Sequence, residues 1–490
     1  MKKQNTLLLL ALIILCFVSR IPQLISPNLV LDGDECIEAL MAKHLYQCKD
    51  VAFYFYGQLY GFSLFETFVI AIFYSVFHVT DIAVKLAMLT MWTGGIIFFY
   101  RALCHISTGN KWLPVLVILV FIFCPAWAVW SMKARGGYLS SFLLTSVVIS
   151  LLFNKSKIAK NSTWLFIGAT LVFIYQCQPL FLPGLIPLLG YALYKNFSFK
   201  KVAAALAGIA PVIVLFLIIR NNSKDYYTTS PFNFHWAAFK TVGTIPSFLY
   251  THFNGYYYFS YVYKPSVFAS VLSVATIGFI VVIIIAALVW LFRRKGSRSL
   301  FYCSMLSVVF TFLYIVFRTE DNYRYFLPIA GYMLLAFFLM ADSIKARRAL
   351  VNIPLIAYSA IGIFSMAGFY DYAYNYSPKP PILQTIKFAQ EHHIQYAFTG
   401  CLLQWQLIFY ADEAILCRWH SETDRYQEYV DKTDRAYSLS PASSALILSN
   451  GEFPDDIKPN VINLNNGYSI LLHPDRKLLE RMDFDLGKVK

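Results

Sequence analysis

Charged residues are scarce in this chain of 490 residues, where they make up 14% of the sequence. Soluble domains contain about 25%. Hydrophobic residues make up 58% of the chain, and the mean hydropathy is +0.55. The shortage of charge excludes an ordinary soluble protein and indicates a membrane protein. The net charge of +14 is then typical of cytoplasmic loops and lipid headgroup contacts, so no nucleic-acid partner is expected.

Metal-binding motifs and internal repeats are also missing. The nine cysteines form no CxxC pair, and no group of histidines has ligand spacing. The ligand spacing therefore does not support a divalent metal, which stays an open alternative, and no other cofactor is expected. Cys36 and Cys48 could pair only if their loop lies in an oxidising compartment, an alternative that stays open.

Apolar runs follow one another through the first three quarters of the chain. A spanning helix needs about 20 mainly apolar residues. Candidates lie at about 5–25, 62–79, 82–100, 112–130, 137–153, 163–178, 179–195, 202–220, 266–292, 300–317, 324–341 and 350–370. The charge pattern does not settle whether the number of spans is odd or even, so we expect 11–13 transmembrane helices. The first run follows Lys2 and Lys3 without a small-residue cleavage site, which predicts an uncleaved helix.

Positive charge is concentrated in five short loops between these runs, and the positive-inside rule places such loops in the cytoplasm. They contain Arg101 and Lys111, Lys155–Lys160, Lys195–Lys201, Arg293–Arg298, and Lys345–Arg348. The outer face then contains the other connecting segments: the loops 26–61 and 221–262, the sequence SMKARGGY at 131–138, and the residues after 370.

The composition changes after YSPKPP at 376–381, where long apolar runs end. ILQTIKFAQEHH and CLLQWQLIFYA are predicted helices, whereas IQYAFTG, EAILCRW and SSALILSN are predicted strands. We therefore expect a transmembrane domain at 1–375 and a small extracytoplasmic α/β domain at 376–490. The fold class is an α-helical polytopic membrane protein with this added domain.

Three carboxylates crowd the stretch LDGDECIEALMAKHL at 31–45. Asp32 and Glu35 have the spacing of a helix capping box. Apolar residues recur on one face of the helix that follows, which predicts an amphipathic helix lying on the bilayer surface. Capping does not require Asp34. Either Asp34 adds only a charge that the helix dipole favours, or it is a general base for a hydroxyl at the membrane surface.

Cations on the same outer face suit a lipid-borne phosphate. Lys133 and Arg135 lie in SMKARGGY, and Arg324 lies in RTEDNYRYFLP. Arginine offers a planar fork of donors for phosphate oxygens, and Gly136–Gly137 permits close backbone approach to a ligand. The alternative for each cation is a contact with lipid headgroups.

Aromatic residues dominate FYFYGQLYG at 53–61. Tyr56, Gln58 and Tyr60 are candidates for binding a sugar, with ring faces for C–H groups and an amide for hydroxyls. The alternative is an aromatic belt at the membrane interface.

Taken in order, these motifs resemble the GT-C polytopic glycosyltransferases. The likeness is to bacterial family-39-like members of the superfamily of protein O-mannosyltransferases and the lipid A aminoarabinose transferase. It is carried by GDE (33–35), FYGQLY (55–60), KARGGY (133–138), RYFLP (324–328), QWQLIFYADEAIL (404–416) and DRY (424–426). Relatives often carry an acid soon after the GQ-Y motif, but Glu66 is displaced here and receives no role.

The resemblance implies transfer of a monosaccharide from a polyprenyl-phosphate donor to a hydroxyl on the outer face of a bacterial cytoplasmic membrane, with inversion. It implies that the pair Asp34–Glu35 is catalytic and that Lys133, Arg135 and the pair Arg324–Tyr325 bind the donor phosphate. Membrane lipids and a glycolipid, polysaccharide or protein acceptor are the expected partners.

Two other functions remain open from the sequence. A flippase or transporter of lipid-linked sugars would also have many helices and buried cations, but it would not need an outer α/β domain. A membrane scaffold would leave the outer cations without a role.

Overall fold

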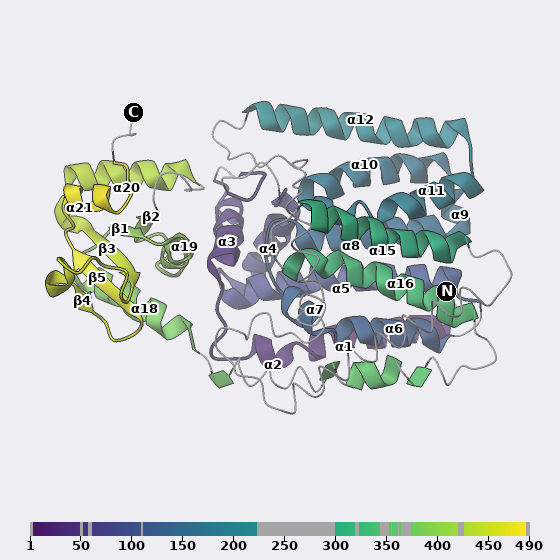
Figure 1. The fold of residues 1–490 in the computed structure, drawn as a ribbon, viewed down its shortest axis with the longest axis horizontal. Helices are drawn as coiled ribbons and strands as arrows, with labels where there is room; N and C mark the ends of the chain where they lie inside the picture. Colours follow the sequence, from purple (N-terminus) through teal and green to yellow (C-terminus); the bar gives the residue numbers. More distant parts are fainter. Residues whose placement is uncertain are drawn as a thin grey trace.

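The computed structural model describes residues 3–49, 52–56, 61–108, 111–222, 299–318, 323–343, 352–353, 355–360, 362–363, 374–375, 377–419 and 426–486. Helices that run roughly alongside one another form one part of the molecule (Figure 1). A small sheet with its own helices forms the other part, and α3 (Gly33–Tyr46) lies between them.

Apolar helices build the larger part because their runs contain few breakers and little charge. The longer ones are α1 (Lys3–Val18), α4 (Leu64–Phe77), α5 (Asp81–Ile106), α6 (Trp112–Ile122), α8 (Tyr138–Phe153), α10 (Asn161–Cys177), α11 (Leu185–Lys195), α12 (Phe199–Asn222), α15 (Ser299–Arg318) and α16 (Leu327–Ser343). Short helical segments connect them: α2 (Ile21–Leu24), α7 (Pro125–Trp130), α9 (Lys155–Ile158), η1 (Pro179–Phe181) and η3 (Tyr323–Phe326).

Five helices in the described part of the chain are long and apolar enough to cross a membrane. They are Thr6–Leu24, Asp81–Ile106, Phe199–Asn221, Ser299–Phe317 and Arg324–Asp342. The sequence predicted 11–13. The numbers differ partly because several apolar runs form shorter helices, such as α6 and α7, which are separated by Phe123 and Cys124. The candidate at 266–292 lies outside the described residues.

The helix α12 lies at the edge of this part (Figure 1). Large apolar side chains remain exposed on it. They include Leu206, Val214, Leu215, Leu217 and Ile218, each more than two-fifths exposed. Water would make such a surface costly, whereas lipid tails solvate it. The chain is therefore a multi-pass membrane protein.

The smaller part contains a five-stranded sheet of order β2-β1-β3-β5-β4. Its strands are β1 (Tyr396–Thr399), β2 (Leu416–Arg418), β3 (Ser444–Ser449), β4 (Ile462–Asn463) and β5 (Tyr468–Leu472). The first three pair in parallel, and the pairs β3–β5 and β4–β5 are antiparallel. Its helices are α18 (Lys379–Glu391), α19 (Cys401–Tyr410), α20 (Gln427–Leu439) and α21 (Arg476–Arg481). The two helices and three strands predicted here are confirmed.

The sequence predicted an amphipathic helix with an exposed face, but α3 exposes neither side. All of its residues from Gly33 to His44 are buried. One side packs on α4 and another on α19. A Cβ on Gly33 would lie 2.6 Å from the carbonyl oxygen of Leu402, so the two backbones touch. Sequence periodicity shows an apolar face but cannot show that a distant segment covers the polar one.

The disulfide between Cys36 and Cys48, which the sequence left open, does not form. Cys36 is buried within α3, Cys48 is exposed after its end, and both carry free thiols.

Candidate active site

A capping box begins α3, as the sequence predicted. The amide of Glu35 donates to Asp32 Oδ1 over 2.9 Å, and the amide of Asp32 donates to Glu35 Oε2 over 3.1 Å. These two bonds satisfy amides that have no partner within the helix. The prediction of a capping role for Asp32 and Glu35 is confirmed.

Asp34 forms an ion pair with Arg135, through Oδ2 and Nη2. The carboxylate of Asp34 is almost buried, with 9% of its side chain exposed, whereas 23% of the Arg135 side chain is exposed. Beside this pair, Lys133 Nζ lies 2.7 Å from Asp32 Oδ2. The loop between α7 and α8 therefore carries two cations directly onto the first turn of α3.

The segment η3 brings Arg324 and Tyr325 to the same region. Arg324 Nη2 donates to the hydroxyl of Tyr325 over 3.3 Å, and its guanidinium lies over that ring, 5.1 Å from the centroid. The charge of Asp34 also attracts Arg324. The three predicted cations, Lys133, Arg135 and Arg324, thus gather around the same helix start.

These charges keep Asp32 ionised. Burial opposes its charge, but Lys133 and Arg135 outweigh burial and hold the pKa of the Asp32 carboxyl below its usual range. The cations are therefore partly neutralised by the acids of α3. An incoming anion would have to share or replace these partners.

Lys85 is a further cation that the sequence analysis did not single out. It lies on α5 and forms an ion pair with Glu35 Oε1. It is the only charged residue in the predicted span 82–100, and a lone charge within an apolar helix was the available signal. With Oε2 bound to the amide of Asp32, both oxygens of Glu35 are engaged.

Two buried acids, Glu38 and Glu66, accept hydrogen bonds from the backbone of the cationic loop. Glu38 accepts from the amide of Gly136 over 3.1 Å, and Glu66 accepts from the amide of Arg135 over 3.3 Å. The sequence analysis gave neither a role, because Glu66 is displaced from the acid that relatives carry after the GQ-Y motif and Glu38 lay outside the apolar face of its helix. Both side chains are fully buried.

The backbone structure explains why the KARGGY sequence has glycine at positions 136 and 137. Gly136 and Gly137 have φ angles of +54° and +83°, which favour glycine. A Cβ on Gly137 would lie 2.5 Å from the carbonyl oxygen of Cys177. The close approach that Gly137 permits is therefore to α10, and not to a ligand as the sequence suggested.

Tyr56 lies against the C-terminal part. Its hydroxyl lies 3.0 Å from Nδ1 of His44, and its ring stacks on that of Tyr426 with centroids 4.2 Å apart. Only 1% of the residue is exposed. Gln58 and Tyr60, the other two predicted sugar ligands, lie outside the described residues.

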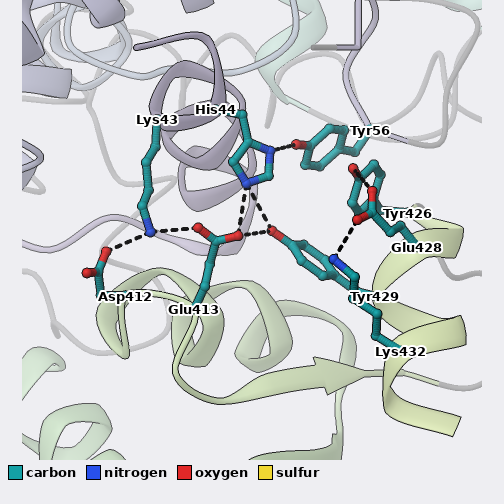
Figure 2. Close-up of polar contacts among 9 residues, drawn as sticks. All are labelled: Lys43, His44, Tyr56, Asp412, Glu413, Tyr426, Glu428, Tyr429 and Lys432. Carbon is teal, nitrogen blue, oxygen red and sulfur yellow. Dashed lines mark hydrogen bonds and ion pairs between the residues drawn. The ribbon is translucent and has the colours of Figure 1, made fainter. Parts of the chain in front are cut away.

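A polar cluster beside Tyr56 ties α3 to the C-terminal part (Figure 2). Lys43 Nζ lies 2.6 Å from Glu413 Oε2 and 2.6 Å from Asp412 Oδ1. His44 Nε2 lies 2.9 Å from Glu413 Oε1, and the hydroxyl of Tyr429 donates to the same oxygen over 2.9 Å. The C-terminal part thus completes the burial of the helix that carries Asp34.

The arrangement suits an anionic group that reacts with a hydroxyl. Lys133, Arg135 and Arg324 offer donors for phosphate oxygens, and Asp34 can accept a proton beside them. Within the described residues, no three His, Cys, Asp or Glu side chains group as a candidate metal site.

No protein-family model matches this sequence, and neither does any curated protein. Two crystal structures of ArnT from Cupriavidus metallidurans are similar to it. The one bound to undecaprenyl phosphate has a TM-score of 0.59 at 12% identity, over 96% of this chain and 98% of that chain. The one in the apo state has a TM-score of 0.57 at 12% identity, over 96% and 97%. From its first membrane helix to its C-terminal sheet, the chain therefore has the GT-C fold that ArnT adopts, as its motifs predicted.

Proposed function

We propose that this protein transfers a monosaccharide from a polyprenyl-phosphate donor to an acceptor hydroxyl. The observation that carries the proposal is the ion pair between Asp34 and Arg135, which joins a proton acceptor to a phosphate ligand. The ArnT structure with bound undecaprenyl phosphate adds support, because a polyprenyl phosphate is the leaving group of this reaction.

Each bond change in the proposed reaction has a group to serve it. The acceptor oxygen attacks the anomeric carbon of the donor sugar, and Asp34 takes the proton of the acceptor hydroxyl. The bond from the anomeric carbon to the phosphate oxygen breaks, and polyprenyl phosphate leaves with the electron pair. A single displacement with one base inverts the anomeric configuration.

Cations serve the leaving phosphate better than a general acid does, because it departs as an anion. Arg135 and Arg324 bind it in this proposal, with Lys133 as a third ligand and Tyr325 beside Arg324. As Arg135 turns to the phosphate, it withdraws from Asp34, and the loss of this cation makes that carboxylate a stronger proton acceptor. Donor binding thereby prepares the base.

The remaining predicted residues take supporting parts in the proposal. Glu35 holds the helix start and Lys85, and so keeps Asp34 in place. Gln58 and Tyr60 are proposed to contact the sugar. Tyr56, stacked on Tyr426, is proposed to anchor their segment rather than to offer a free ring face.

The reaction is proposed for the outer face of a bacterial cytoplasmic membrane. Residues 1–375 form the membrane domain, and 376–490 form an extracytoplasmic domain. The acceptor is a glycolipid, a polysaccharide or a protein.

Cells without the gene test this function. They should accumulate one polyprenyl-phosphate sugar and lose that sugar from an envelope glycan. The wild-type gene should restore the glycan, and Asp34→Asn should not. Unchanged glycans and carrier pools in the deleted cells would contradict the proposal. Movement of the intact donor across vesicles by the purified protein would favour a flippase.

A further inference from the structure

The loop 131–137, which carries Lys133 and Arg135, is held along its length. At its start, Ser131 Oγ accepts from Nε of Arg20 over 3.0 Å, and Arg20 is fully buried. At its end, Gly137 packs on the backbone of Cys177. Between these points, its amides bond to two carboxylates.

Glu66 is the anchor of the loop and of the helix that follows it. Its Oε2 accepts from the amide of Arg135, and its Oε1 accepts from the amides of Leu139 and Ser140 over 3.1 and 3.2 Å. The residue before α8 is Gly137, which has no side chain to cap these amides. Glu66 therefore caps α8 from another helix.

Glu38 lies on the neighbouring helix and holds the middle of the loop. Besides the amide of Gly136, it contacts the hydroxyls of Ser63 and Thr67, at 2.5 and 3.0 Å. Ser63 Oγ also lies 3.0 Å from the carbonyl oxygen of Gly61. The hydroxyl of Ser63 has one hydrogen, and the carbonyl oxygen of Gly61 can only accept it. If Glu38 carries a proton and donates it to Ser63 Oγ, both contacts of Ser63 are hydrogen bonds.

We propose that Glu38 and Glu66 are positioning residues that hold loop 131–137 so that Arg135 faces Asp34 and the donor phosphate. The phosphate part of this inference rests on the proposed function, whereas the part about the loop does not. Neither acid touches the substrate. They act through the backbone of the loop.

The proton on Glu38 makes the attachment of loop 131–137 sensitive to pH. Burial, and then the charge of Glu66, raise the pKa of Glu38 to about 8. The groups that face Glu38 are Glu66, the hydroxyls of Ser63 and Thr67 at the start of α4, the amide of Gly136 in the loop, and the thiol of Cys177 at the end of α10. Above pH 8 a second charge appears beside Glu66, and we expect repulsion to loosen the loop.

Two substitutions separate the roles. Glu38→Gln keeps the neutral form at every pH. Glu66→Gln replaces one acceptor oxygen with an NH2 group, which then meets the backbone amides of the loop or of α8. Asp342→Asn is the matched control. Asp342 is a buried carboxylate that accepts from the amide of Thr108 over 2.7 Å, at the far end of α16 from η3.

The experiment measures two quantities on the full-length protein in nanodiscs. Hydrogen exchange of the peptide 131–141 reports loop order without any ligand. Affinity for undecaprenyl phosphate between pH 6 and 9.5 reports whether Arg135 is held where it can bind the phosphate. We expect Glu66→Gln to speed exchange about tenfold and to weaken binding about tenfold at every pH. Glu38→Gln should lose the decline in affinity that wild type shows above pH 8, and Asp342→Asn should match wild type in both quantities.

Unchanged exchange in Glu66→Gln, or a wild-type pH profile in Glu38→Gln, would overturn the inference. If Glu66→Gln does not accumulate, the pH profile of Glu38→Gln decides. If wild type binds no undecaprenyl phosphate, the proposed function fails, and hydrogen exchange still decides whether the acids hold the loop.

Discussion

The ion pair between Asp34 and Arg135 joins the first turn of α3 to the loop before α8. In the proposed reaction, one partner takes a proton and the other binds the leaving phosphate. Because the two groups touch before substrate binds, each controls the availability of the other. The predictions below separate this pair from the structure that supports it.

Replacing Asp34 should stop the reaction without unfolding the protein. Asp34→Asn removes the proton acceptor and keeps its shape, so we expect turnover to fall at least about 100-fold. Asp32→Asn is the control, because asparagine also caps helices well. The pair that it loses with Lys133 is partly exposed, so stability should fall by only about 1 kcal/mol. Turnover and melting temperature are measured for both variants. Wild-type turnover in Asp34→Asn would remove the base from the mechanism.

Arg135 should matter for its geometry as well as its charge. Arg135→Ala removes charge-assisted hydrogen bonds worth about 1.5–3 kcal/mol, so affinity for undecaprenyl phosphate should fall roughly 10- to 100-fold. Arg135→Lys keeps the charge without the planar fork, so its affinity should lie between those of wild type and Arg135→Ala. Arg481→Ala, which breaks an exposed pair with Asp456, should bind normally. Equal affinity in all three variants would mean that the phosphate binds elsewhere.

The contact between α3 and α19 should tolerate no added atoms. Gly33→Ala places a methyl group against the backbone of Leu402, and overpacking of this kind costs about 1–3 kcal/mol. Gly400→Ala is the control, since nothing lies within 4 Å of its Cβ. Thermal unfolding should show a lower melting temperature for Gly33→Ala alone. Equal melting temperatures would indicate that the C-terminal part does not press on α3.

Glu413 should stabilise the attachment of the C-terminal part. Glu413→Gln removes the carboxylate that Lys43 and His44 share and leaves Lys43 its pair with the exposed Asp412. Because most of the cluster is buried, we expect a loss of about 2 kcal/mol. The control is Glu480→Gln, whose pair with Arg476 is exposed and should contribute little. Denaturation of both variants at pH 7 measures the difference. A loss in Glu480→Gln as large as in Glu413→Gln would count against this cluster.

Acid should weaken the same attachment. Burial opposes the charge of Glu413, but hydrogen bonds from His44 and Lys43 outweigh burial and lower the pKa of Glu413 well below its usual range. The folded pKa is below the unfolded value of about 4.3, so this stabilisation is complete above that pH and is lost as the pH falls. Glu413→Gln should unfold with less dependence on pH between 5 and 3. An identical acid profile in wild type and variant would contradict the assignment.

Local patterns in the sequence predicted the local structure. The spacing of Asp32 and Glu35 predicted the capping box, and alternating composition predicted α18, α19 and three strands. The positive-inside rule led to the expectation that the GDE and KARGGY motifs share one face, and their ion pairs bring them into contact. Such features depend on residues close in sequence or on a property of the whole membrane.

Contacts between distant segments could not be predicted in the same way. Periodicity left Glu38 and Lys43 outside the apolar face of the helix, yet the loop amides and Glu413 bury them. Glu66 and Lys85 are isolated charges in apolar runs, and a sequence does not show which partner such a charge meets. Gly33 likewise gives no sign that Leu402 will lie against it.

Sugar transfer by the purified protein is the most direct test of the central claim. Wild type and Asp34→Asn are placed in liposomes with the polyprenyl-phosphate sugar that accumulates in deleted cells and with the matching acceptor. Mass spectrometry then measures polyprenyl phosphate and glycosylated acceptor. We predict that wild type releases one polyprenyl phosphate for each sugar transferred and that Asp34→Asn releases none. Movement of the donor across the bilayer by wild type, with no polyprenyl phosphate released, would contradict the account.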